Sequence, residues 1–210
     1  MKILIIGASR GIGLRTVEAA LAAGHDVRAL ARSAEAIPLS HARLEKVAGD
    51  ALDRASVLRA LDGMDAVVQV LGLAPGPAYV TGTELFSKAT RILVDGMAAH
   101  GPKRLVVVTG LGAGDSRESL GLYAIPFMIA LKRVYDDKDI QERIVRNSTL
   151  DWTILRPGIL QDGEAKGTAR VLPDRKEWRQ GPVRRADVAS AIVDELETGR
   201  NLRQTPAVIE

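Results

Sequence analysis

Short apolar runs rich in valine, isoleucine and leucine recur along the chain, and most of them lack alternating polar positions. This composition is typical of strands that are buried on both faces of a parallel sheet. The pattern predicts six strands and a possible short seventh, at Lys2–Ile6, His25–Ala31, Leu44–Ala48, Ala66–Leu71, Arg104–Thr109, Trp152–Leu155 and Ala207–Ile209.

Helical segments are expected between these runs, at Gly11–Ala23, Arg54–Leu61, Thr83–His100, Val134–Asn147 and Ala186–Thr198. Gly24, Gly63, Gly101 and Gly199 follow four of them, where a helix commonly ends in a left-handed residue. Regular alternation of strand and helix implies right-handed crossovers and an α/β, doubly wound parallel sheet. We expect one three-layered Rossmann domain over residues 1–210, with strand order 3-2-1-4-5-6 and the seventh strand at the edge.

The segment from residue 110 to about 135 interrupts the alternation. It contains several glycines and the apolar stretch Leu120–Leu131, which includes Tyr123 and Phe127. Ligands of open α/β sheets bind beyond the carboxyl ends of the strands, so this segment is predicted to be a substrate loop or lid. A surface helix or a dimer contact is an equal alternative, which leaves the choice between monomer and homodimer open.

Composition narrows the chemistry. The chain has 210 residues, no cysteine and three widely spaced histidines, which excludes disulfides and thiolate sites and argues against a metal enzyme. Its net charge is +3, its arginines are dispersed and only 3% of its residues are aromatic, which argues against a nucleic-acid partner. The apolar runs are too short for a signal peptide or a membrane helix, so we expect a cytoplasmic protein that acts on a small molecule.

The strongest chemical signal is a glycine-rich segment that directly follows the first predicted strand and opens the first helix. Here Gly7 would permit the tight turn, Gly11 would let the backbone approach a pyrophosphate, and Gly13 would let the helix pack closely on the sheet. The free N–H groups and partial positive charge of the helix start favour phosphates. We therefore predict a dinucleotide site at Gly7, Ala8, Ser9, Arg10, Gly11, Ile12 and Gly13.

The end of the second strand indicates which dinucleotide binds. About 20 residues past the glycine motif, NAD-binding proteins carry an acidic residue for the ribose hydroxyls, but this chain has Ala31 and Arg32. The planar guanidinium of Arg32 suits a 2′-phosphate, and Arg10 could approach the same phosphate from the other side. These residues predict NADP(H), and the alternative is that both are ordinary surface arginines.

Two further strand ends are predicted to contact the cofactor. Asp50 and Ala51 follow the third strand, and the Asp50 carboxylate could accept a hydrogen bond from the adenine amino group. Asp50 could instead cap the next helix, a role that Asp53 could also serve. Leu71 and Gly72 end the fourth strand, where a small residue would let the adenosine ribose lie against the backbone.

The sequence resembles the short-chain dehydrogenase/reductase superfamily. More narrowly, it resembles the small atypical NAD(P)H-binding branch that includes flavin reductase, also called biliverdin-IX-beta reductase. The resemblance covers nearly the whole chain. It rests on the glycine motif, on Gly49-Asp50, on Thr109 at the end of the fifth strand, on Lys138 and Glu142, on the segment Leu150–Gly158 and on Arg185-Ala186-Asp187-Val188-Ala189.

The resemblance implies site residues. Lys138 falls at the position of the lysine that binds the nicotinamide ribose, whereas Val134 falls where typical members carry the proton-donating tyrosine. Tyr135 comes one residue late, so it is either a catalytic acid or a tyrosine of the pocket wall. Thr109 would bond near the nicotinamide or the substrate.

Further assignments follow from the same resemblance. Pro157, Gly158 and Ile159 would lie along the carboxamide of the nicotinamide. Arg156 is expected to be structural and to pair with Glu142 or Asp187, and Tyr123 and Phe127 could wall a flat acceptor.

The resemblance also implies an activity. Atypical reductases of this kind need little acid–base help, because their conjugated acceptors, such as flavins or quinones, take hydride readily and can take a proton from solvent. We therefore expect an NADPH-dependent oxidoreductase that reduces a small conjugated acceptor. The alternative is an NADP(H)-binding regulator of the NmrA type without turnover. The retained Lys138 and the short segment after Gly158 favour the enzyme.

Overall fold

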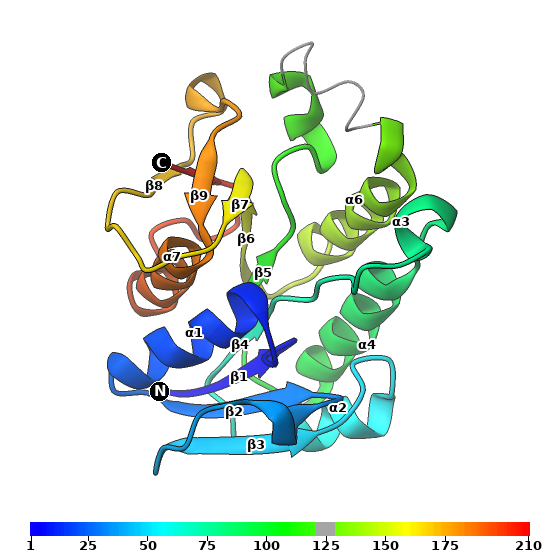
Figure 1. Ribbon diagram of the computed structural model, residues 1–210. Helices are drawn as coiled ribbons and strands as arrows, with labels where there is room; N and C mark the ends of the chain where they lie inside the picture. Colours follow the sequence, from blue (N-terminus) through cyan, green and yellow to red (C-terminus); the bar gives the residue numbers. More distant parts are fainter. Residues whose placement is uncertain (121–128) are drawn as a thin grey trace.

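The computed structural model describes residues 1–120 and 129–210 (Figure 1). Within these residues, eight strands form one sheet in the order β3-β2-β1-β4-β5-β6-β10-β8, and β7 and β9 form a small second sheet. The first seven strands of that order run parallel, and β8 pairs antiparallel with β10. The strands are β1 (Lys2–Ile6), β2 (Asp26–Ala31), β3 (Leu44–Ala48), β4 (Ala66–Gln69), β5 (Arg104–Val108), β6 (Asp151–Pro157), β7 (Ile159–Gln161), β8 (Arg170–Leu172), β9 (Pro182–Arg184) and β10 (Ala207–Ile209).

This topology confirms the predicted doubly wound fold and its 3-2-1-4-5-6 order. The seventh strand forms at Ala207–Ile209, but it lies inside the sheet rather than at its edge, because β8 pairs with its outer side. The sequence pattern did not indicate β7, β8 or β9. Each of these is only three residues long, too short to show a period.

Helices cover both faces of the sheet and give the three layers (Figure 1). Ile3 and Ile5 of β1 face a core formed with α1 and α7, whereas Leu4 and Ile6 face a core formed with α2 and α4. This alternation explains why β1 is apolar at nearly every position, since both of its faces are buried. The helices are α1 (Gly11–Ala22), α2 (Arg54–Leu61), α3 (Ala78–Thr81), α4 (Leu85–His100), α6 (Lys132–Arg146) and α7 (Arg185–Thr198).

Three of the four glycines that were predicted to end helices have the expected left-handed conformation. Gly24, Gly63 and Gly199 have the predicted positive φ, at +88°, +69° and +59°. Gly101 does not, because its φ is −125° and its backbone is extended. A Cβ there would lie 3.2 Å from the Cα of Met97, so close packing explains this glycine.

The start of α4 is fixed by a distant residue. It begins at Leu85, two residues later than predicted, and the buried Asp137 of α6 accepts hydrogen bonds from the backbone N–H groups of Phe86 and Ser87. A carboxylate that satisfies free N–H groups at a helix start also complements the helix dipole. In the described ranges, no helix has both the length and the apolar character needed to cross a membrane.

Candidate active site

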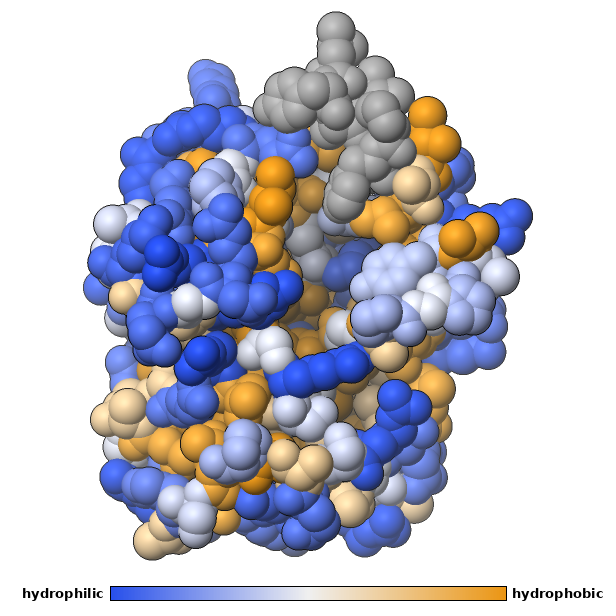
Figure 2. All heavy atoms as spheres, in the orientation of Figure 1, coloured by the Kyte–Doolittle hydropathy of each residue, from blue (hydrophilic) through white to orange (hydrophobic). Residues whose placement is uncertain are grey.

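A cavity of about 1210 Å³ lies at the carboxyl ends of the parallel strands. Residues at the ends of β1, β2, β4, β5 and β6 line it, which is where open α/β sheets bind ligands. Figure 2 shows a hollow in the middle of this face, with hydrophobic surface inside it and hydrophilic side chains around it. The fold therefore brings the strand ends singled out in the sequence into one site.

The three glycines of the first loop have different physical reasons. Gly7 has a φ of +92°, and a Cβ there would lie 2.4 Å from the carbonyl oxygen of Val70. A Cβ on Gly13 would lie 2.1 Å from the carbonyl oxygen of Gly7. Gly11 has a φ of +57°, but the nearest atoms to its Cβ position in the described structure belong to the Arg185 side chain, about 3.9 Å away. Gly7 and Gly13 are thus needed for packing, whereas a Cβ on Gly11 would only touch the Arg185 side chain, so its positive φ is what favours glycine there.

The start of α1 is open toward the cavity. Arg10 is the N-cap residue, and no side chain in the described part of the chain caps this helix end. The first turn also contains no acidic residue. The N–H groups of this turn therefore remain available, and they offer an anion the positive end of the helix dipole.

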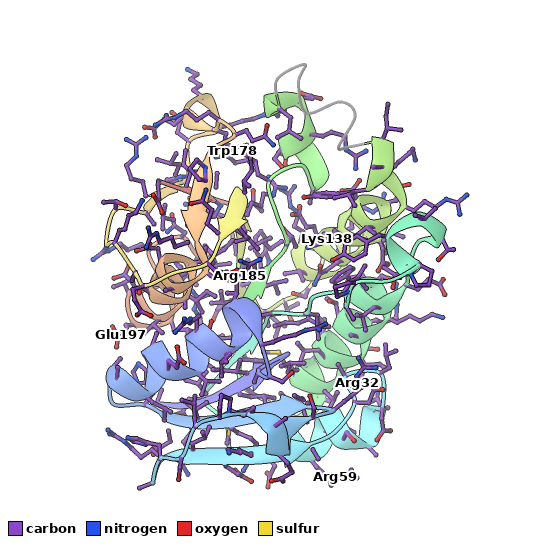
Figure 3. All side chains as sticks on the ribbon, viewed as in Figure 1. Arg32, Arg59, Lys138, Trp178, Arg185 and Glu197 are labelled. Carbon is purple, nitrogen blue, oxygen red and sulfur yellow. The ribbon has the colours of Figure 1, made fainter. Side chains whose placement is uncertain are left out.

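Arg32 at the end of β2 and Arg10 both line the cavity (Figure 3 labels Arg32). Asp50 lines it too, and its carboxylate accepts a hydrogen bond from the N–H of Leu52 at 2.9 Å. Asp53, rather than Asp50, caps α2, because it accepts from the N–H groups of Ala55 and Ser56. Asp50 therefore does not serve as the helix cap that was considered for it.

Lys138 extends from α6 into the same cavity. Its Nζ donates a hydrogen bond to the backbone carbonyl of Thr109 and lies 4.7 Å from the centre of the Phe86 ring. Burial lowers the pKa of Lys138 to about 8, although the nearby carboxylates of Glu142 and Asp137 oppose this shift. The side chain is therefore a cation near neutral pH, held at the end of β5.

Tyr135 and Lys138 make separate hydrogen bonds. Its hydroxyl donates to the carbonyl of Leu111 at 3.4 Å, whereas Lys138 donates to that of Thr109. Burial raises the pKa of Tyr135, against the opposing charge of Arg117. A phenol with a raised pKa stays neutral and releases its proton less readily, so this tyrosine lacks the activation that typical members give theirs.

The hydroxyl of Thr109 makes a hydrogen bond within the protein. It donates to Oε1 of Glu142 at 2.8 Å, and the same oxygen accepts from Nε of Arg156 at 2.9 Å. Arg156 also pairs with Asp115, with Nη2 and Oδ1 2.7 Å apart. The expected pairing of Arg156 with Glu142 is confirmed. The alternative partner, Asp187, instead accepts from the N–H groups of Lys166 and Gly167.

Comparison with known proteins agrees with this geometry. A family model described as NAD(P)H-binding matches residues 7–198, which is most of the chain. The chain belongs to this NAD(P)H-binding family.

Three known proteins are similar to this chain over most of its length. An uncharacterized sugar epimerase, YhfK of Bacillus subtilis strain 168, is 28% identical over 204 residues, which cover 94% of this chain and 88% of YhfK. A 3-diazoavenalumate denitrifying reductase of a Streptomyces species is 32% identical over 187 residues, covering 81% of this chain and 59% of that protein. The structure of ChuY, an anaerobillin reductase from Escherichia coli O157:H7, matches with a TM-score of 0.80 and 30% identity, covering 100% of this chain and 97% of that one.

Most of the site residues predicted from the sequence line the cavity. Ala8 and Gly13 do not line it, because both are buried members of the glycine loop. Pro157, Gly158 and Ile159 do line it, but Gly158 has a packing role as well, since a Cβ there would lie 2.2 Å from the carbonyl oxygen of Gly181. The cavity is also lined by Gly7, Ser9, Arg10, Gly11, Ile12, Arg32, Asp50, Ala51, Leu71, Gly72, Thr109, Tyr135 and Lys138.

Parts of the predicted lid lie in the cavity wall. Gly110, Leu111, Leu131 and Val134 contribute to it, whereas Tyr123 and Phe127 lie outside the described residues. The structure adds wall residues that the sequence did not indicate, Tyr79, Leu85, Phe86, Gln180 and Arg185. Of these residues, only Arg185 belongs to a segment that resembles the family. The others could not be predicted, because no spacing rule links their positions to the glycine loop.

Proposed function

We propose that this protein is an NADPH-dependent oxidoreductase that transfers hydride to a small conjugated acceptor such as a flavin or a quinone. The observation that carries this proposal is one cavity that is lined both by the uncapped start of α1 and by apolar side chains. The membership of the NAD(P)H-binding family supports the cofactor. Two relatives are named reductases, which supports reduction as the reaction.

The cavity suits a phosphorylated dinucleotide. Its diphosphate would bind the free N–H groups at the start of α1, next to Gly11. Gly72 would leave room for the adenosine ribose, because a Cβ there would meet no atom of the described residues within 4 Å. Arg32 and Arg10 would hold the 2′-phosphate, and Lys138 would hold the nicotinamide ribose.

The other half of the cavity suits a flat apolar ring. Phe86, Leu111, Val134 and Ile159 line it with apolar side chains. When bound, NADPH supplies a hydride, and the acceptor takes one proton from solvent to complete its two-electron reduction. The protein contributes positioning and exclusion of water, since Tyr135 has no activating contact from Lys138.

The test of turnover follows the near-ultraviolet absorbance of NADPH in the presence of FMN, a quinone or dichlorophenolindophenol. We expect oxidation of NADPH with at least one of these acceptors. Tight binding of NADPH with no oxidation by any of the three would refute the enzyme and support the regulator.

A second test addresses the choice of cofactor. Replacing Arg32 by Asp should weaken NADPH binding more than about tenfold and leave NADH binding nearly unchanged, because only NADPH carries the 2′-phosphate. Arg59→Asp is the matched control, since Arg59 lies on α2 and outside the cavity (Figure 3). Equal losses for both nucleotides in the Arg32 variant would contradict the NADPH preference.

A further inference from the structure

Arg185 lies over the glycine loop although the two are far apart in sequence. It is the first residue of α7, and Gly11 is the first residue of α1. The Nε atom of Arg185 lies 3.9 Å from the position that a Cβ on Gly11 would take, and its Cδ atom lies 4.0 Å from it. Arg185 also lines the cavity, and Figure 3 shows it between α7 and the start of α1. Its side chain therefore lies over Gly11, the one glycine of the loop whose Cβ position meets no backbone atom of the described residues.

The surroundings concentrate positive charge at this point. The two helices pack against each other, and both begin beside the cavity. Asp187, the acidic residue in the first turn of α7, is buried and already accepts from the N–H groups of Lys166 and Gly167. It therefore does not compensate the start of α1, where an anion would meet free N–H groups and the Arg185 cation.

Arg185 is held in place by a weak partner. Its Nη1 atom donates to Oδ1 of Asp162 at 2.8 Å. The Asp162 side chain is 92% exposed, whereas that of Arg185 is 28% exposed. A pair with one strongly solvated member contributes little to stability, so a better anion can replace the aspartate at small cost.

We propose that Arg185 binds the diphosphate of the dinucleotide from the side opposite the glycine loop, and that the diphosphate replaces Asp162 as its partner. This inference rests on the proposed function, because it assigns a further residue to the same cofactor. Asp162 keeps the guanidinium over the loop in the free protein and competes with the incoming diphosphate. Arg185 thus contributes to affinity for both dinucleotides, whereas Arg32 distinguishes between them.

The experiment measures dissociation constants of NADPH and NADH by titration calorimetry. Arg185→Ala should weaken both by about tenfold and by equal factors, because both carry the diphosphate and a charge-assisted hydrogen bond is lost. Arg184→Ala is the matched control. Arg184 is the preceding arginine, but it donates to the carbonyl of Glu164 and does not line the cavity.

A second variant tests the competition without removing the arginine. Asp162→Asn should tighten the binding of both nucleotides by about two- to threefold, because the bound state no longer has to displace a carboxylate. The same substitution in the Arg185→Ala background should have no effect. Circular dichroism of each variant verifies that it is folded.

The outcomes separate this inference from the proposed function. Unchanged affinity in Arg185→Ala, or a loss confined to NADPH, would overturn the diphosphate contact while leaving the reductase proposal intact. If Asp162→Asn has the same effect with and without Arg185, the proposed competition is wrong. Failure of the wild-type protein to bind either nucleotide would overturn the proposed function and this inference together.

Discussion

Arg156 and Glu142 form a fully buried ion pair behind the cavity, with Nη2 and Oε2 2.5 Å apart. Glu142 also accepts a hydrogen bond from the hydroxyl of Thr109, and the carbonyl of Thr109 accepts a hydrogen bond from Lys138. The pair therefore stabilises the end of β5, where Lys138 makes its hydrogen bond. The guanidinium also lies 5.1 Å from the centre of the Trp178 ring, which adds a cation–π contact.

Removing one member of this pair should cost more than removing both. Arg156→Met leaves the Glu142 carboxylate buried without its cation, and we expect the free energy of unfolding to fall by about 3–5 kcal/mol. The double variant Arg156→Met/Glu142→Met should be less destabilised than either single variant. Urea unfolding measures these differences.

The control for this prediction is an exposed pair. Arg200 and Asp194 lie 3.5 Å apart, with side chains 70% and 52% exposed. Arg200→Ala should change stability by less than about 0.5 kcal/mol. Additive losses in the double variant of Arg156 and Glu142 would show that the two residues act independently.

The lowered pKa of Lys138 predicts a pH dependence. Burial penalises the charged form and places the pKa at about 8, so the ammonium is present below this pH and is lost above it. We expect kcat/KM for NADPH oxidation to be flat below about pH 7 and to fall by up to about tenfold per pH unit above pH 8. A profile from about pH 6 to about pH 10 measures this effect.

Two variants of Lys138 test whether its positive charge causes the alkaline decline. Lys138→Arg keeps a cation and should abolish the alkaline decline, because arginine does not titrate in this range. Lys138→Met should be slower than the wild type below about pH 8 and should show no decline. An alkaline decline that persists in Lys138→Met would assign the titration to another group.

Substitutions at two glycines should affect binding and stability differently. Gly72→Val puts a side chain into free space, so it should leave the melting temperature unchanged and weaken NADPH binding by filling the place of the ribose. Gly13→Ala should instead destabilise the protein, because its Cβ would lie 2.1 Å from a backbone oxygen. Thermal melts and calorimetric titrations of the two variants test this contrast, and unaltered NADPH affinity in Gly72→Val would contradict the ribose position.

Tyr135 should matter little for the rate. Its hydroxyl lacks the lysine contact that would activate it, so Tyr135→Phe should change kcat by less than about threefold. Loss of a working general acid typically costs about 100- to 10,000-fold. Single-turnover measurements of NADPH oxidation make the comparison, and a loss in that larger range would restore Tyr135 as the proton donor.

The sequence by itself determined the layered fold and the glycine-rich loop, since both depend on local patterns. Buried parallel strands appear as continuous apolar runs, and the glycine motif can be recognised because a strand precedes it and a helix follows it. The different roles of Gly7, Gly11 and Gly13 also followed from general geometry. The structure adds the backbone clashes that a Cβ on Gly7 or Gly13 would make, and the approach of Gly11 to a pyrophosphate stays a prediction.

Only the tertiary structure decided which distant residues meet. It placed Arg185 over Gly11, gave Asp115 to Arg156 and separated the hydrogen bonds of Tyr135 and Lys138. These relationships join segments that lie far apart in the chain, or depend on which way a side chain turns from its helix. No local period encodes either of them, because they arise only when the sheet assembles and the packing of its helices fixes each side chain.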